Sequence, residues 1–177
     1  MIVLITGASS SGKSLTAETI TTELRTCGDL YYIATMRPYD DEAKARVKRH
    51  QEMRAEKGFT TIEKYVDIRS IEITPDSTCL IECMSNLLAN EMYDEDGCKT
   101  LSDKKIVDDI LYLRDVKQAK NVVIVSNEVF SDGTLYDEWC TDYIDNLGKI
   151  NVALGLAADT VIESVVGIPI YHKGGAV

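Results

Sequence analysis

The eight residues GASSSGKS, from Gly7 to Ser14, constrain the fold of this chain more than any other segment. They match the phosphate-binding pattern G-x-x-x-x-G-K-[ST] and directly follow the apolar run IVLIT at residues 2–6. A segment of helical character comes next, so the strand, loop and helix that such a site requires occur in the correct order. This order argues against the alternative of a chance loop rich in glycine and serine. The sequence therefore predicts a bound nucleoside triphosphate.

Four further apolar runs rich in β-branched residues recur along the chain. They are LYYIA at 30–34, TCLIEC at 78–83, NVVIVS at 121–126 and TVIESVV at 160–166. Continuous runs of this kind are typical of strands buried on both faces. Segments with helical stripes separate them, formed by Leu15, Ile20 and Leu24, by Ile106, Ile110 and Leu113, and by Trp139, Tyr143, Leu147, Ile150 and Leu154. The alternation predicts an α/β, P-loop NTPase-like fold, with a mostly parallel sheet, helices on both faces and one nucleotide-binding domain over residues 1–177.

Composition and charge limit the partners. A hydrophobic fraction of 45% in 177 residues is enough for a buried core and argues against disorder. The formal net charge of -10 disfavours non-specific binding to nucleic acid or to an anionic membrane, because both would repel the chain. We therefore predict a small-molecule ligand, with neither nucleic acid nor membrane as a partner.

Cysteine usage and hydropathy bear on the compartment. The five cysteines form no C-x-x-C pair, and with only two histidines they suggest neither a disulfide framework nor a zinc site. No run approaches the roughly 18 apolar residues of a membrane span, and no secretory pattern stands at the N-terminus. These observations predict a cytoplasmic protein.

The phosphate loop predicts a role for each of its main residues. Gly7 and Gly12 let the loop turn so that backbone N–H groups point at phosphate oxygens. Lys13 is expected to reach the β- and γ-phosphates, and Ser14 to bind Mg²⁺. The nucleotide-binding residues predicted in the loop are Gly7, Ala8, Ser9, Ser10, Ser11, Gly12, Lys13 and Ser14.

Two glutamates stand where predicted parallel strands end. Glu82 ends the run CLIE, and Glu128 follows VVIVSN. Open α/β sheets bind their ligands at the carboxyl ends of their strands. Glu82 is the predicted metal carboxylate, together with Ser14, although P-loop proteins more often use Asp and a solvated turn residue is the alternative. For Glu128 the same two alternatives stay open.

The segment at 40–58 is predicted to be a helix, because acidic residues occupy its first turn and a glycine ends it. Ala43, Val47, His50 and Arg54 share one face, so the histidine points inward. Two interpretations of His50 remain at this point. It is either a hydrogen-bonded core residue or a neutral imidazole that attacks a phosphorus atom while nearby cations bind the phosphates.

Six short blocks occur along the chain in order, from residue 1 to about 173. They are GASSSGKS, YYIATM, DDEAKARVKRHQEMR with TTIE behind it, LIECMSNLL, VVIVSNEV and DNLGKINVALGLAADTVIESVVGIPIYHK. The series resembles the motifs of the bifunctional adenosylcobinamide kinase/adenosylcobinamide-phosphate guanylyltransferase family. The resemblance implies an enzyme of cobalamin biosynthesis and salvage that phosphorylates adenosylcobinamide with ATP or GTP. It also implies that GMP passes from GTP to adenosylcobinamide phosphate through a guanylylated histidine, giving adenosylcobinamide-GDP.

The resemblance also implies site residues and partners. His50 falls on the guanylylated position and, with Lys13, is the expected catalytic residue, whereas His172 has no such match and is expected on the surface. Mg²⁺ is the implied cofactor, GTP and ATP are substrates, and a corrinoid is the acceptor. A homo-oligomer, with a trimer expected by analogy, is implied as well. Nucleotide-binding residues outside the loop are Arg46, Arg54, Glu63 and Glu82.

The chain departs from the family pattern at several positions. Phe59 stands where a tryptophan is usual, and FSDGTLYDEW replaces a glycine-rich loop after VSNEV. Two other functions therefore stay open. One is a different P-loop small-molecule kinase in which His50 only packs. The other is a nucleotide-binding regulatory protein without catalysis, which the altered loop at 130–139 suggests.

Overall fold

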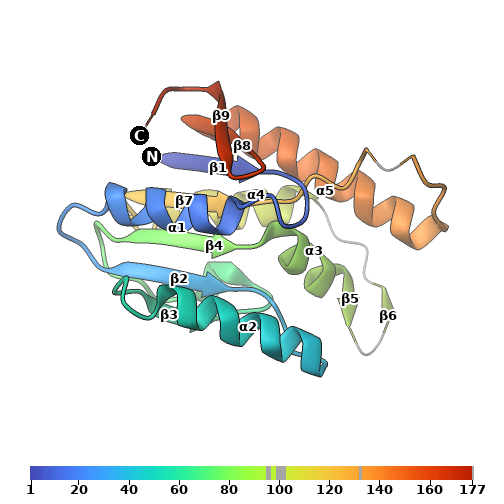
Figure 1. Cartoon of the computed structure of the whole chain (residues 1–177), viewed down its shortest axis with the longest axis horizontal. Coiled ribbons are helices and arrows are strands. Elements are labelled where there is room, and N and C mark those ends of the chain that lie inside the picture. Colours follow the sequence, from blue (N-terminus) through green and yellow to red (C-terminus); the bar gives the residue numbers. More distant parts are fainter. Residues whose placement is uncertain (95–96, 99–102, 132, 177) are drawn as a thin grey trace.

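The computed structural model describes residues 1–94, 97–98, 103–131 and 133–176. Some side chains lie outside this description, namely those of Ala43, Arg46, Met53, Asp94, Cys98 and Asp103. A seven-stranded sheet forms the centre, in the order β3-β2-β4-β7-β1-β8-β9 (Figure 1). Its strands are β1 (Ile2–Thr6), β2 (Leu30–Ala34), β3 (Thr60–Glu63), β4 (Thr78–Glu82), β7 (Asn121–Val125), β8 (Thr160–Val165) and β9 (Ile168–Lys173).

The sheet is parallel from β3 to β8, and only its last strand reverses. β9 runs antiparallel to β8, joined by the turn at Val166 and Gly167. Each of the five apolar runs in the sequence forms a strand within one residue of its predicted bounds. The predicted mostly parallel sheet is therefore confirmed, with two strands, β3 and β9, added at its edges.

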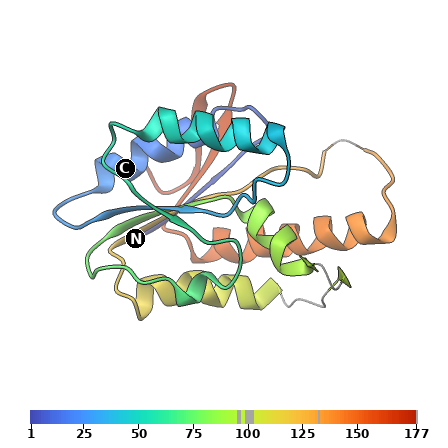
Figure 2. The ribbon, with the colours of Figure 1, turned by 90° about the horizontal axis from the view of Figure 1, so that it is seen from below.

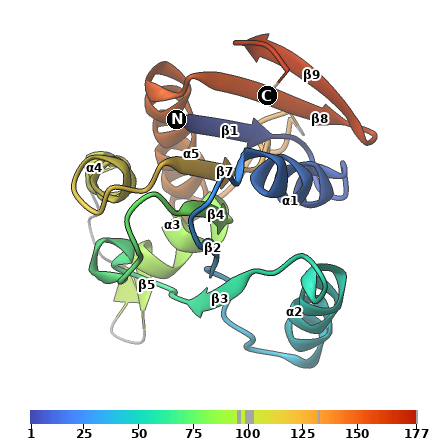
Figure 3. The same cartoon turned by 90° about the vertical axis from the view of Figure 1, so that its left-hand side faces the viewer.

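Helices cover both faces of the sheet, as Figures 2 and 3 show. α1 (Lys13–Leu24) and α2 (Asp41–Arg54) lie on one side. α3 (Met84–Met92), α4 (Asp103–Asp115) and α5 (Glu138–Ala157) lie on the other. A 3₁₀ turn (η1, Ile68–Ser70) and a small hairpin of β5 (Tyr93–Asp94) and β6 (Gly97–Cys98) complete the described elements. Among the described helices, none combines the length and apolar character that crossing a membrane requires.

Alternate residues of each strand enter two separate cores. Val3 and Ile5 pack with α1, whereas Ile2 and Leu4 pack among the side chains of α3, α4 and α5. All four are at most 3% exposed, because helices cover both faces of the sheet. Burial on both faces explains why these strands read as continuous apolar runs.

Two predicted helix stripes are partly wrong. Leu15 is 54% exposed, because the face of α1 that meets the sheet runs through Ala17 and Ile20 and Leu15 lies on the far side. Trp139 is 57% exposed, since the first turn of α5 projects beyond the sheet (Figure 1). The helix expected over 40–58 ends at Arg54, where the chain passes into turns.

Candidate active site

The phosphate loop connects β1 to α1 at the carboxyl edge of the sheet. Gly7 and Gly12 have φ values of 154° and 91°. A Cβ atom on Gly7 would lie 2.6 Å from the Ser164 carbonyl oxygen, and one on Gly12 would lie 3.0 Å from the Gly167 Cα. Both positions therefore need glycine for backbone conformation and for close packing.

The turn between β8 and β9 supports the loop from behind. The Ser11 carbonyl accepts hydrogen bonds from the Gly167 N–H and the Ser164 hydroxyl, both at 2.8 Å. The loop conformation thus depends on residues more than 150 positions later in the chain.

Lys13 begins α1 and is only 8% exposed. Its Nζ donates a hydrogen bond of 2.8 Å to the Ala8 carbonyl within the loop. Burial lowers the pKa of Lys13, and the nearby Cys83 and Glu82 groups act in the opposite direction. A buried cation within the phosphate loop is well placed to bind an anion.

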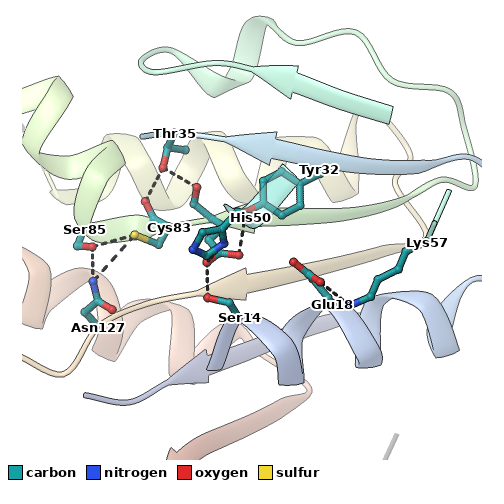
Figure 4. Close-up of polar contacts among 10 residues, drawn as sticks. Ser14, Glu18, Tyr32, Thr35, His50, Lys57, Cys83, Ser85 and Asn127 are labelled. Carbon is teal, nitrogen blue, oxygen red and sulfur yellow. Dashed lines mark hydrogen bonds and ion pairs between the residues drawn. The ribbon is translucent and has the colours of Figure 1, made fainter. Parts of the chain in front are cut away.

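Glu82, the last residue of β4, receives two hydroxyl groups. Ser14 Oγ donates to its Oε1 at 2.5 Å, and the Tyr32 hydroxyl donates to its Oε2 at 3.0 Å (Figure 4). Burial and the Glu82 charge raise the pKa of Tyr32, so this phenol stays a donor. Serine hydroxyl and carboxylate oxygens are ligands that Mg²⁺ accepts, so the Ser14–Glu82 pair fits the predicted metal.

His50 reaches the same place from α2. Its Nδ1 lies 3.7 Å from Glu82 Oε1, and Figure 4 shows the ring above Ser14. This distance is within ion-pair range but too long for a hydrogen bond. Among the described residues, Nδ1 is buried and has no hydrogen-bond partner. The inward orientation predicted for His50 is confirmed.

Arg54, one turn further along α2, is buried against an aromatic pair. Its guanidinium carbon lies 3.8 Å from the Tyr32 ring centroid, and its Nε donates to Thr61 Oγ1 at 3.4 Å. Phe59 also packs against Tyr32 in a T-shaped arrangement, with ring centroids 5.9 Å apart. The aromatic at position 59 therefore supports the residue that holds Arg54. The Arg46 side chain lies outside the described part of the structure.

One cavity of about 420 Å³ joins these groups. Its size is in the range of small-ligand sites. Most of the predicted site residues line it, namely Ser9, Ser10, Lys13, Ser14, His50, Arg54, Glu63 and Glu82. Gly7, Ala8, Ser11 and Gly12 shape the loop behind this lining. His172 stays apart on exposed β9, where it pairs with Glu163 at 2.8 Å.

The remaining two strand-end glutamates also line the cavity. Glu63 ends β3, and its carboxylate accepts a 2.9 Å hydrogen bond from the Tyr65 hydroxyl. Glu128 follows β7; its N–H donates to the Gly7 carbonyl at 3.0 Å, and its carboxylate accepts from the Phe130 N–H at 2.8 Å. The rule that ligands bind at strand ends thus placed Glu128 correctly in space, whereas Glu63 was expected here only from the family resemblance.

Sequence reasoning missed several polar residues of the cavity. Ser85 Oγ lies 2.9 Å from the Cys83 sulfur and accepts a 2.5 Å hydrogen bond from Asn127 Nδ2. Cys83 is the last residue of one predicted strand and Asn127 directly follows another, so the same strand-end rule would have found them. Tyr32 carried no such signal, because it lies in the middle of an apolar run.

Comparison with known proteins identifies the family of this chain. A family model described as cobinamide kinase / cobinamide phosphate guanyltransferase, CobU, matches residues 3–171. The chain belongs to the CobU family. The resemblance inferred from the sequence blocks is thereby confirmed, and with it an enzyme of the kinase and guanylyltransferase class.

Relatives within the CobU family match along their whole length. The bifunctional adenosylcobalamin biosynthesis protein CobU of Escherichia coli (strain K12) is 29% identical over 185 residues, covering 98% of this chain and all of that protein. The bifunctional adenosylcobalamin biosynthesis protein CobP of Pseudomonas aeruginosa is 25% identical over 174 residues, covering 97% and 96%.

Solved structures support the fold. A protein from Pyrococcus horikoshii OT3 superposes with a TM-score of 0.54 at 13% identity, covering 99% of this chain and 87% of that one. The flagellar accessory protein FlaH from Methanocaldococcus jannaschii gives a TM-score of 0.51 at 11% identity, covering 98% and 78%. Identities this low show the fold alone, and the predicted P-loop NTPase-like architecture is confirmed.

Proposed function

We propose that this one cavity carries out both reactions of the CobU family. The first is phosphorylation of the adenosylcobinamide hydroxyl with ATP or GTP. The second is transfer of GMP from GTP to adenosylcobinamide phosphate through His50, giving adenosylcobinamide-GDP. The observation that carries the proposal is that His50 and the phosphate loop share a cavity, with His50 Nδ1 3.7 Å from the carboxylate that binds Ser14.

The loop and its neighbours would hold the nucleotide. Lys13 would leave the Ala8 carbonyl to bind the β- and γ-phosphates, and the loop N–H groups would bind phosphate oxygens. Ser14 and Glu82 would hold Mg²⁺, which neutralises phosphate charge when bound. Arg54 and Glu63, from the wall of the cavity, and Arg46 complete the proposed nucleotide site.

Guanylyl transfer would proceed in two displacements at the α-phosphorus of GTP. A ring nitrogen of neutral His50 donates its lone pair to phosphorus, and the bond to the bridging oxygen breaks, so that pyrophosphate leaves. A phosphate oxygen of adenosylcobinamide phosphate then attacks the same phosphorus, and the nitrogen–phosphorus bond breaks. His50 returns to its neutral form with a free lone pair.

The kinase reaction uses the other end of the triphosphate. The corrinoid hydroxyl would attack the γ-phosphorus in line with the departing nucleoside diphosphate. Positioning of the hydroxyl and the electrostatic action of Lys13 supply most of the catalysis that this reaction class needs.

The proposal also covers the compartment, the domain organisation and the assembly of the enzyme. We propose a cytoplasmic, single-domain protein that acts on a corrinoid and forms a homo-oligomer, with a trimer expected by analogy. Exposed apolar side chains on the β8–β9 hairpin, among them Val166, Ile168 and Ile170, support an interface between copies.

The first test is the intact mass of the protein after incubation with GTP and Mg²⁺, without corrinoid. We expect the chain to gain one GMP that is labile to acid, and His50→Ala to gain none while still binding GTP. The matched control is His172→Asn, which removes the exposed histidine and should gain GMP as the wild type does.

The mass measurement, combined with an assay of corrinoid turnover, separates the alternatives. A wild-type chain that binds GTP, phosphorylates adenosylcobinamide and gains no mass would be a P-loop kinase without a covalent intermediate. Binding without any corrinoid-dependent turnover would indicate a regulatory protein. GMP attached to His50→Ala would contradict the assigned nucleophile.

A further inference from the structure

A buried cluster of three side chains lies beside the phosphate loop. Glu18 from α1, His50 from α2 and Glu82 from β4 each place one ligating atom within 4.8 Å of the others. Glu18 is fully buried, one turn after Ser14 on the same helix. Figure 4 shows its carboxylate directed toward His50, with Lys57 behind it. No motif in the sequence predicts a carboxylate here.

Two atoms of this cluster lack hydrogen-bond partners within the described part of the chain. They are Glu18 Oε1 and His50 Nδ1, and both are shielded from solvent. The other Glu18 oxygen accepts from Lys57 Nζ at 2.5 Å, and both Glu82 oxygens receive hydroxyl groups. Buried polar atoms without partners are rare and costly.

The two unpartnered atoms are chemically complementary. A carboxylate oxygen can only accept a hydrogen bond, whereas Nδ1 of a neutral imidazole donates when it carries the proton. Glu18 and His50 each place one ligating atom within 4.8 Å of the other, a separation that a small side-chain movement can close or one water molecule can span. Glu18 and Glu82 together thus present acceptors to the same imidazole ring.

A transition-metal site is the competing interpretation, because imidazole and two carboxylates can bind such an ion. The charges of the cluster argue against it. Lys57 already pairs with Glu18. Burial lowers the pKa of the Lys13 ammonium group, and the nearby Glu82 charge acts to raise it. Arg54 stacks on the Tyr32 ring, whose hydroxyl contacts Glu82. Three cations already balance the two carboxylates, so an ion bound without nucleotide would be an uncompensated buried charge, whereas Mg²⁺ at Ser14 and Glu82 would bind together with the phosphates that balance it.

We propose that Glu18 is a positioning residue for His50. Together with Glu82 it holds the proton on Nδ1, which leaves the lone pair on Nε2 for attack on phosphorus. When the nitrogen–phosphorus bond forms, the ring gains positive charge, and the carboxylates beside Nδ1 stabilise it. This inference rests on the proposed function, since it takes His50 as the nucleophile.

The kinetic test compares Glu18→Gln with Glu23→Gln, which changes an exposed glutamate of the same helix. We expect Glu18→Gln to slow GMP attachment about 10- to 100-fold, the range found for partners that orient metal-ligating histidines. GTP affinity should stay within about twofold, and Glu23→Gln should behave as wild type. The double variant Glu18→Gln/Lys57→Met removes both charges of the pair, so it separates loss of positioning from loss of folding. It should be as slow as the single variant.

The spectroscopic test uses the fact that the chain has two histidines. In His172→Asn, the ¹⁵N imidazole signals report His50 alone. At about pH 8, where an ordinary imidazole is neutral, we expect the Nδ1–H tautomer to dominate, and Glu18→Gln to shift the equilibrium toward Nε2–H.

Each other outcome overturns the inference. A dominant Nε2–H tautomer in the otherwise wild-type chain would do so, as would unchanged attachment rates in Glu18→Gln. Stoichiometric metal in the purified protein, with EDTA shifting the Nδ1 signal, would make the cluster a metal site. If no GMP attaches to wild type, the proposed function fails, and the tautomer measurement still tests Glu18 separately.

Discussion

At the scale of residues, the site is distinguished by a charged side chain that is buried. Lys13 is buried before any nucleotide arrives, and burial lowers the pKa of its ammonium group. A depressed lysine pKa means that folding disfavours the charged form, so this charge opposes stability at neutral pH. The residue is therefore better explained by phosphate binding than by folding.

Replacing this charge should separate stability from binding. We expect Lys13→Met to weaken GTP binding at least about 10-fold, because charge-assisted hydrogen bonds contribute roughly 1.5–3 kcal/mol. The thermal midpoint of the nucleotide-free protein should not fall. Calorimetric titration and thermal unfolding measure the two effects, with exposed Lys149→Met as control. A large loss of stability in Lys13→Met would contradict this account.

Residue roles could be predicted where a local rule applied. The loop motif located Lys13 and Ser14, and the strand-end rule located Glu82. Glu18 could not be predicted, because a polar residue on a helix is ordinarily solvated and only Lys57, 39 positions later, explains its burial. Tyr32 reaches Glu82 only through the register of β2 on β4, which no local pattern encodes.

At the scale of elements, α2 is unusual because polar side chains attach it to the rest of the protein. Arg54 stacks on Tyr32, His50 faces Glu82, and Lys57 just beyond the helix pairs with buried Glu18. Few apolar side chains of the helix are described as buried, so its local stability depends on these charged contacts.

Breaking the Lys57 contact should loosen α2. We expect Lys57→Met to destabilise the protein by about 2 kcal/mol, since it leaves the Glu18 charge buried and unpaired while Lys57 itself is partly exposed. Hydrogen exchange should quicken in residues 41–54 more than in α1 or α4. The control is Lys48→Met, whose ion pair with Glu52 is exposed. Equal exchange in both variants would show that this pair does not anchor the helix.

Elements with strong patterns were predictable, and those at the periphery were not. The five buried strands could be predicted from their apolar runs. β9 contains Pro169 and is largely exposed, so it has no such run. β3 is an edge strand of four residues, and α3 has only nine residues for a helical stripe. In each case tertiary pairing, rather than local propensity, decides the structure.

At the scale of the whole molecule, the exposed hairpin of β8 and β9 is the place to test assembly. Ile168 is 62% exposed on an edge strand that could pair with another chain. If copies associate there, Ile168→Asp should shift the molar mass measured by light scattering toward the 19.6 kDa of one chain. Val116→Asp, at an exposed apolar site after α4, should leave the mass unchanged. A wild-type mass of one chain would contradict the oligomer.

The position of β1 has a consequence for how the enzyme is made. Both of its neighbours in the sheet, β7 and β8, come from the last third of the chain. The Ser11 carbonyl, in the loop after β1, accepts a hydrogen bond from the Gly167 N–H. A ribosome therefore synthesises the phosphate-binding sequence well before it reaches Gly167, and that sequence acquires its shape only after Gly167 has been added. A chain that ends before β8 carries the motif without the strand and the hydrogen bonds that shape it, so we expect it to bind GTP more weakly than the longer chain.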